Sequence, residues 1–197
     1  MKFWKLSRAQ LLVARVSRNR HRRLVRSMLL DASELDLGLW SLADDRTWRA
    51  GTIGERTDEA RRARSAGCFT ALRSFRRDGP SRGLWIQITS FASSTDAESV
   101  IPKMRSGLSA SVTSKVAVQD ERDVTDVEVR AFSQAVVVEK TVVRGGVTGF
   151  NRYIIGSVGA VVCALGCSGA GSTWSLDDVV QFAVLQGEKV QRVLAEA

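Results

Sequence analysis

The sequence is poor in the residues on which most enzyme mechanisms depend. It contains one histidine, His21, together with one tyrosine and three cysteines among 197 residues. Nucleophilic catalysis by serine or cysteine normally needs a neighbouring base, and the single imidazole lies near the N-terminus, apart from the main body of the chain. A structural zinc site takes four nitrogen or sulfur ligands, and the cysteines form no CxxC pair. We therefore expect no catalytic histidine, no metal and no cofactor.

Acidic residues are absent from the first 30 positions. Nine of the 29 lysines and arginines lie there, so the formal net charge of +8 belongs to this segment and the rest of the chain is close to neutral. Attraction to phosphate or anionic lipid would therefore come from this segment alone. We expect residues 1–28 to form a basic arm and residues 29–197 to form one folded domain.

Long apolar runs are also missing. The longest uncharged apolar run of the basic arm covers residues 11–14, which is too short for a secretory signal. Residues 158–168 fall short of the roughly 18 apolar residues of a membrane span. We find no signal peptide in the sequence, which predicts a cytoplasmic protein if Met1 is the true start.

The arginines of the basic arm predict an amphipathic helix over residues 2–30. Arg15, Arg18, Arg22 and Arg26 fall within one arc of a helical wheel. Apolar side chains gather roughly opposite: Phe3, Leu6, Val13, Leu24, Val25 and Met28. Such a helix can contact an anionic membrane surface, follow the phosphates of a nucleic acid, or bury its apolar side on the body.

The first half of the body mixes apolar and charged segments. Residues 29–40 are apolar enough to dock on a core, whereas the charges and glycines of residues 44–67 predict a long surface loop. A short helix is expected over residues 68–76. The alternation in residues 84–91 predicts a half-buried strand, and the hydroxyls that follow it predict the start of a helix over residues 93–108.

The second half is rich in strand patterns. Strands are expected over residues 112–118, 127–131, 135–143, 147–155 and 158–167. Gly145 with Gly146, and Gly156 with Gly159, lie where hairpin turns belong. Ser175 and Asp178 form an acidic variant of the capping box before a C-terminal helix. Short connections predict a mostly antiparallel sheet, so the fold class is α+β, with helices flanking the sheet and a basic helix at the N-terminus.

Two carboxylate pairs and one glycine-rich turn resemble functional motifs only superficially. Asp44 and Asp45 lie in the expected charged loop, where solvation explains them. Asp177 and Asp178 lie in the first turn of the expected C-terminal helix, where acids favour the helix dipole. Residues 166–172 lack the lysine of a phosphate-binding loop and are expected to be an ordinary strand-to-helix connection. We therefore do not expect an enzyme.

Trp85 and Trp174 are the aromatic residues best placed to contact a ligand. Trp85 is expected to face outward from its strand, and Trp174 precedes the C-terminal helix, so the two can border a groove between sheet and helix. Burial of both indoles in the core is the alternative.

The three thiols leave their oxidation state open. Cys163 and Cys167 lie on one expected strand, about 13 Å apart, which is too far for a bond between them. If the chain is exported, the oxidising environment allows a disulfide between Cys68 and either Cys163 or Cys167. Three buried free thiols are the alternative.

Several segments together resemble a known family. They are residues 29–37 (LLDASELDL), Cys68, residues 88–99 (ITSFASSTDAES), residues 153–162 (YIIGSVGAVV), and a C-terminal helix that starts near Trp174 and contains Gln186. In these features the body resembles exported actinobacterial domains of LpqN-type mycobacterial lipoproteins and of the extracytoplasmic sensor domains of some receptor kinases. The resemblance implies a PsbP-like α/β/α sandwich, a location in the cell envelope or outside the cell, and no catalytic signature.

The residues and the resemblance together predict a noncatalytic binding module of the actinobacterial cell envelope. Its body is expected to recognise a small apolar ligand or a protein, while the basic arm contacts anionic lipid. The alternative is a cytosolic protein whose basic arm binds nucleic acid. It ranks second because no aromatic residues are interleaved among Arg15, Arg18, Arg22 and Arg26. The third hypothesis is that the basic arm packs on the body and has no function of its own.

Overall fold

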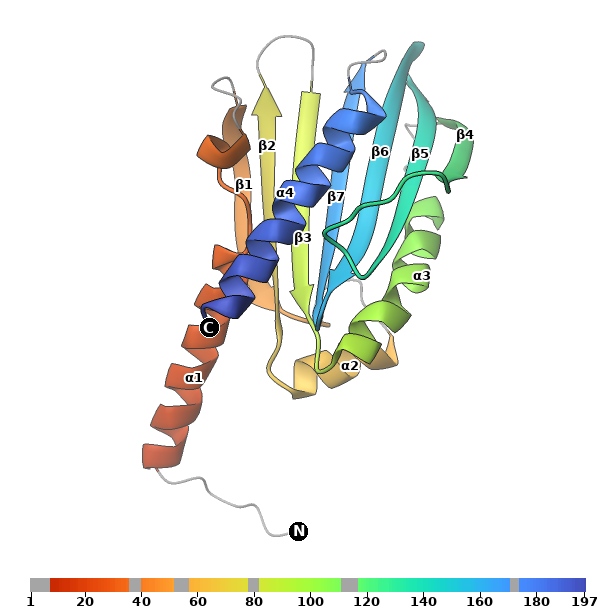
Figure 1. Ribbon diagram of the computed structural model, residues 1–197. Helices are drawn as coiled ribbons and strands as arrows, with labels where there is room; N and C mark the ends of the chain where they lie inside the picture. The colour runs from red at the N-terminus through yellow and green to blue at the C-terminus, as the bar shows by residue number, and fades with distance from the viewer. Residues whose placement is uncertain (1–7, 36–39, 52–56, 78–81, 111–116, 171–173) are drawn as a thin grey trace.

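One antiparallel sheet of seven strands forms the middle layer of the described molecule, with helices packed on both of its faces (Figure 1). The structure is a computed structural model that describes residues 8–35, 40–51, 57–77, 82–110, 117–170 and 174–197. Every pair of neighbouring strands is antiparallel. The expected α+β class, with a mostly antiparallel sheet flanked by helices, is confirmed.

The strands follow the order β1-β2-β3-β7-β6-β5-β4 across the sheet. Their bounds are β1 (Trp40–Arg49), β2 (Phe69–Arg77), β3 (Arg82–Ser90), β4 (Ala117–Val124), β5 (Gln134–Arg144), β6 (Val147–Val158) and β7 (Val161–Ala170). The helices are α1 (Arg8–Ser27), the short 3-10 helix η1 (Ala32–Leu35), α2 (Asp58–Ser65), α3 (Ser94–Ala110) and α4 (Leu176–Ala195). β1 and β4 are the edge strands, and α3 carries the chain from the middle of the sheet to its far edge.

Tight turns join β5 to β6 and β6 to β7. Gly145 and Gly146 have φ angles of 57° and 80°, and Gly159 has 54°, which are values that glycine adopts without strain. The hairpin turns predicted at Gly145–Gly146 and at Gly159 are confirmed. Gly156 instead lies within β6, where a Cβ atom would come within 2.4 Å of the Phe132 ring.

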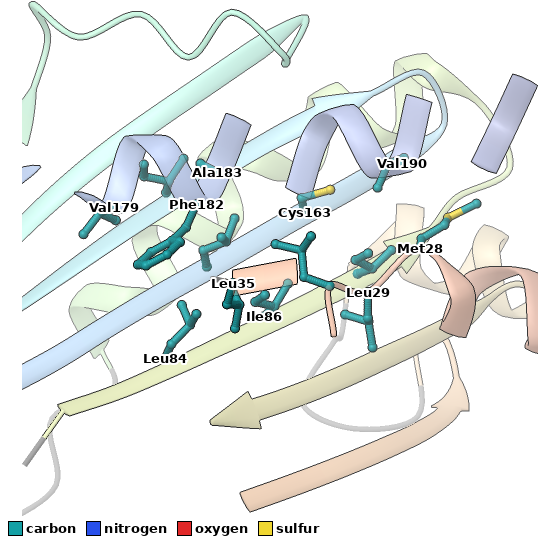
Figure 2. Packing of buried hydrophobic residues seen from close by; sticks show 14 of the residues in the cluster. Met28, Leu29, Leu35, Leu84, Ile86, Cys163, Val179, Phe182, Ala183 and Val190 are labelled. Carbon is teal, nitrogen blue, oxygen red and sulfur yellow. The ribbon is translucent and has the colours of Figure 1, made fainter. Parts of the chain in front are cut away.

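The face of the sheet under α4 holds the larger hydrophobic cluster. α4 begins with the predicted capping box, in which Ser175 Oγ accepts from Asp178 N and the Asp178 carboxylate accepts from Ser175 N, both at 3.0 Å. Figure 2 shows α4 side chains against those of the central strands and of the segment after α1: Met28, Leu29, Leu35, Leu84, Ile86, Cys163, Val179, Phe182, Ala183 and Val190. The C-terminal helix is confirmed, and so is the docking of residues 29–40 on the core for its described residues, through Leu29, Leu30, Leu35 and Trp40.

The opposite face is covered in part by α3, which lies on β5, β6 and β7. Ser93 Oγ accepts a hydrogen bond from Asp96 N at 3.1 Å and so begins the helix as predicted, and Pro102 lies inside it. The buried residues on this face are mostly small: Ala50, Ala63, Ala97, Val100, Ile101, Ile155, Val162 and Ala164.

The surface loop predicted over residues 44–67 is wrong, because this range holds most of β1 and all of α2. β1 is an edge strand with only one neighbour, and Leu42 on it is 56% exposed. Its side chains therefore lack the alternation of apolar and polar residues from which a strand is predicted in a sequence. The apolar side chains that α2 buries are the small ones of Ala60 and Ala63, beside the carboxylate of Glu59, so its apolar helical pattern is weak.

The helix predicted over residues 68–76 is also wrong, because this segment is β2. Cys68, Leu72 and Phe75 are spaced as on one helix face, but Leu72 and Phe75 lie on a strand between β1 and β3, and Cys68 comes directly before it. Phe69, Ala71 and Phe75 alternate with more polar residues and point into the cluster under α4. The segment follows the two-residue alternation of a strand and not the helical spacing, because β1 and β3 supply the backbone hydrogen bonds that a strand needs.

Residues 127–131 form no strand, which corrects another prediction. Val129 is buried in the cluster under α4, and the backbone around it is held by single hydrogen bonds. Phe132 N donates to Val129 O at 2.9 Å, and Gln191 Nε2 donates to Ala131 O at 3.0 Å. Of the strand predicted over residues 112–118, residues 112–116 lie outside the described part, and β4 covers residues 117 and 118.

Candidate functional site

α1 is docked on the body by its C-terminal turns. Val25 and Met28 are almost fully buried, and Leu24 and His21 are half-buried. Figure 1 shows the N-terminal part of α1 extending beyond the end of the sheet. The predicted helix is confirmed over residues 8–27, and the apolar side of its last turns is buried in the body.

Polar side chains from the body hold the segment that follows α1. Gln186 Oε1 accepts from Leu30 N at 3.1 Å, and its Nε2 donates to Met28 O at 2.6 Å. Arg73 Nη1 donates to Leu30 O at 2.9 Å, and Lys189 forms an ion pair with Glu34. Because backbone groups on both sides of Leu29 are held, the direction in which α1 leaves the body is well defined.

His21 lies against the body, although the sequence suggested that it would lie apart from it. Its Nε2 is 3.3 Å from Ser90 Oγ, and its ring packs edge-on against Phe69 with 5.9 Å between centroids. Burial lowers the pKa of His21, which favours the neutral ring. Ser90 is only 6% exposed, and its hydroxyl also contacts Phe69 N and O. We conclude that the two side chains anchor α1 and do not form an accessible nucleophile and base.

The arginines predicted to bind an anionic surface differ in their surroundings. Arg26 forms an ion pair with Asp45 at 2.8 Å, so its charge is compensated within the protein. Arg18 and Arg22 are exposed and have no ion-pair partner among the described residues. The side chain of Arg15 lies outside the described part. Arg23 is a further exposed arginine without a described partner, and the helical arc from the sequence did not include it.

Trp85 and Trp174 do not border one groove, because they lie on opposite faces of the sheet. Trp174 is 4% exposed, stacks on Trp40 at 5.4 Å and donates from Nε1 to Ser168 O at 3.0 Å. It is a core residue. Trp85 is half-buried on the α3 face, where its indole lies over Gly166, at which a Cβ would come within 2.2 Å of Nε1. Only Trp85 therefore remains a ligand-contact candidate.

Among the open hollows on the described surface, two lie beside candidate residues. One of about 360 Å³ lies beside Trp85 and is lined by side chains from β1, β2, β3 and β7, among them Asp44, Ser74, Arg76 and Ser168. The other, of about 530 Å³, lies between α4 and the segment before β5, and its lining includes Glu128, Asp177 and Val180. The first hollow contains Trp85, which the sequence had singled out.

All three cysteines are free thiols and all are buried. Cys163 and Cys167 belong to the cluster under α4, whereas Cys68 belongs to the cluster on the α3 face. The sheet therefore lies between Cys68 and the other two, and the structure has the free thiols that were the alternative to a disulfide. Burial raises the pKa of both Cys163 and Cys167 to about 12, so these thiols stay protonated and unreactive.

Three of the four carboxylates considered as catalytic pairs have structural partners, and Asp177 lies in the first turn of α4. Asp178 caps α4, Asp44 pairs with Arg46 at 2.6 Å, and Asp45 pairs with Arg26 and Arg73. The described residues contain no cluster of three or more His, Cys, Asp or Glu side chains arranged for a metal ion. Among the described helices, none combines the length and apolar character needed to cross a bilayer.

Comparison with known proteins identifies a shared fold. No family model matches the sequence, and no curated protein sequence matches it either. The structure is similar to the crystal structure of the extracellular domain of PknH from Mycobacterium tuberculosis, with a TM-score of 0.59 and 11% sequence identity. The alignment covers 87% of this chain and 96% of that domain. At this identity the likeness establishes that the two chains have the same overall fold.

Proposed function

We propose that the protein is a noncatalytic binding module of the sensor type that works in the actinobacterial cell envelope. The observation that carries this proposal is the fold shared with the extracellular domain of PknH over most of both chains. That domain is the extracellular part of its protein, and the sequence resemblance to exported sensor domains points in the same direction. We propose further, from the sequence resemblance, that the body is a PsbP-like sandwich domain.

The proposal that the module is noncatalytic is supported by how its charged side chains are used. Between α2 and α3, Arg62 pairs with Asp96 at 2.6 Å and Lys103 pairs with Glu59 at 2.8 Å. These contacts join secondary-structure elements and do not converge on a hollow. The open hollow beside Trp85, with its amphipathic indole, is the place where we expect the body to contact a ligand or a protein.

The second part of the proposal is that α1 contacts anionic lipid headgroups. Arg18, Arg22 and Arg23 are exposed without described partners, while Val25 and Met28 are buried in the body. Contact through this part of α1 is therefore electrostatic and does not involve insertion of its apolar side. Each basic residue near an anionic membrane contributes about 1 kcal/mol, so three arginines together contribute about a hundredfold in affinity.

Vesicle flotation tests the role of α1. The full chain is expected to float with vesicles of phosphatidylcholine and phosphatidylglycerol, but not with phosphatidylcholine alone. Replacing Arg18, Arg22 and Arg23 by glutamine is expected to weaken binding about a hundredfold. The same change at Arg76, Arg122 and Arg130, which are exposed on the body, is the matched control. If the wild-type chain does not bind anionic vesicles but binds duplex DNA at low salt, the nucleic-acid alternative is supported instead.

Cell fractionation tests the location. The full chain, expressed in mycobacterial cells and followed by antibody, is expected in the envelope fraction. Recovery only in the cytosol, alongside a cytosolic marker enzyme, would contradict the envelope role.

A further inference from the structure

The docked turns of α1 expose different arginines on its two flanks. Successive residues of a helix are rotated by about 100°, which places Arg18, Arg22 and Arg26 on one flank of the docked face and Arg20 on the other. Arg26 pairs with Asp45 of β1 at 2.8 Å, and Arg20 donates to the carbonyl oxygen of Ala197, after α4, at 3.4 Å. The flank with Arg18 and Arg22 is therefore the one that faces β1.

Two contacts align α1 with the strands beneath it. The first is the ion pair of Arg26 with Asp45, and the second is the packing of His21 against Phe69 at 5.9 Å. Asp45 pairs in register with Arg73 of β2, four residues along the strand from Phe69. α1 and β1 therefore run in opposite directions, so the N-terminal part of α1 lies towards the C-terminal end of β1.

The last residue of β1, at its C-terminal end, is Arg49. Arg49 pairs in register with Phe69, so its side chain lies on the same face of the sheet as the Phe69 ring that His21 contacts. From Asp45 to Arg49 the strand advances by about 13 Å, and from Arg26 to Arg18 the helix advances by about 12 Å. Arg49 thus lies level with Arg18 and Arg22 and on their flank.

Arg49 is exposed, and no acidic residue of the described chain forms an ion pair with it. The acidic side chain on this face of β1, Asp45, is already bound by Arg26 and Arg73. Three uncompensated guanidinium groups from two elements therefore point to solvent at one end of the molecule. Such a surface is complementary to a dense layer of negative charge.

We propose that Arg49 of β1 joins Arg18 and Arg22 of α1 in one composite basic surface that binds the anionic headgroups of a lipid bilayer. This inference rests on the proposed contact of α1 with lipid and adds a residue from the body to it. Because the surface spans a helix and the sheet, it holds the body in one orientation. The end of the sheet with Phe69 faces the bilayer, and the hollow beside Trp85, nearer the other end and on the other face, stays accessible.

Arg49→Gln in the full chain is the direct test, with vesicles of phosphatidylcholine and phosphatidylglycerol as the probe. The variant is expected to bind about fivefold more weakly than wild type, because it lacks the contribution of one basic residue at the surface. Arg122→Gln is the matched control, because Arg122 is also an exposed strand arginine but lies on β4, at the opposite edge of the sheet. Arg49→Lys is expected to retain binding, and Arg49→Glu is expected to lose more than Arg49→Gln.

The outcomes separate the two proposals. If wild type binds and the α1 variants lose binding, but Arg49→Gln behaves like Arg122→Gln, the composite basic surface is refuted and the role of α1 stands. If Arg49→Lys loses as much as Arg49→Gln, a charge-based role of Arg49 is refuted. If wild type does not bind anionic vesicles at all, the proposed function of α1 fails first. Circular dichroism of each variant verifies that the exposed substitution leaves the fold intact.

Discussion

The two faces of the sheet are held by different kinds of interaction. The face under α4 buries large aliphatic and aromatic side chains, and the amide of Gln186 fixes the start of the body to α4. The α3 face has a smaller cluster in which alanine and valine are common. The difference shows that one face supplies most of the cohesion and also fixes the direction of α1.

Ion pairs also join α3 to its neighbours on the α3 face. Glu59 and Arg62 of α2 bind Lys103 and Asp96 of α3. At the other end of α3, Arg105 pairs with carboxylates of β4. Exposed ion pairs contribute little stability each. We therefore expect α3 and α2 to be held less firmly than α4, on the face where the hollow beside Trp85 lies.

Ile154 and Ile155 allow the largest test of this comparison, because they are neighbours on β6 and face opposite sides. Both are buried, Ile154 under α4 and Ile155 under α3. We expect Ile154→Ala to cost about 4 kcal/mol of unfolding free energy and Ile155→Ala about 2 kcal/mol. The reason is that α4, held by Gln186 and Lys189, has less freedom to close the cavity.

Urea unfolding of the two variants, followed by tryptophan fluorescence, measures both costs. The comparison needs equal m-values, because a change in slope would mean that the unfolding is no longer the same transition. Equal costs for the two alanines would show that the faces are equally rigid.

Gln186→Leu is expected to have the next largest effect. Gln186 is fully buried and binds both Leu30 N and Met28 O. Leucine leaves these two backbone groups buried without partners, which costs about 3 kcal/mol. Gln191→Leu removes one hydrogen bond, to Ala131 O, and serves as the control. Hydrogen exchange at residues 21–30 is expected to speed up in the Gln186 variant only, and unchanged protection there would refute its anchoring role.

Glu59 offers the smallest test, on the α3 face. The hydrogen bond from Lys103 is the main reason that the pKa of Glu59 is lowered from 4.5 to about 2. The unfolded chain therefore takes up a proton near pH 4.5 that the folded chain excludes until about pH 2. The stabilisation is present above pH 4.5 and is lost as the pH falls from 4.5 to 2.

Glu59→Gln is accordingly expected to flatten the fall in stability over this range, by at most about 1 kcal/mol because Lys103 is partly exposed. Thermal unfolding at several pH values measures it. Glu98→Gln, at an exposed position of α3, is the control. The same pH profile for Glu59→Gln and wild type would show that the ion pair of Glu59 with Lys103 contributes nothing to the stability.

Much of the fold could be predicted because local chemistry decided it. Ser175 with Asp178, the glycines at 145 and 146, and the apolar face of α4 each specify an element through contacts only a few residues apart. β1 and β2 could not be predicted in the same way. β1 takes its hydrogen bonds from one neighbour and has a mostly polar surface, and β2 carries apolar residues at a spacing that also suits a helix.

The candidate sites depended on tertiary structure more than the elements did. Trp85 and Trp174 appeared equivalent in the sequence, but strand alternation and the position of α4 place them on opposite faces. Arg26 belonged to the same arc as Arg18 and Arg22, but Asp45 compensates its charge. Arg49 has no signal in the sequence, because its relation to α1 arises only from the pairing of β1 with β2.

The sequence by itself determined the class of fold, the antiparallel sheet, the capped C-terminal helix and the concentration of positive charge near the N-terminus. These follow from composition and from contacts between near neighbours in the chain. Only the tertiary structure decided which of the described arginines have no ion-pair partner, which of Trp85 and Trp174 is half-buried beside a hollow, and where His21 lies. Each of these depends on residues far apart in the sequence, whose meeting is set by strand order and helix docking and by no local pattern.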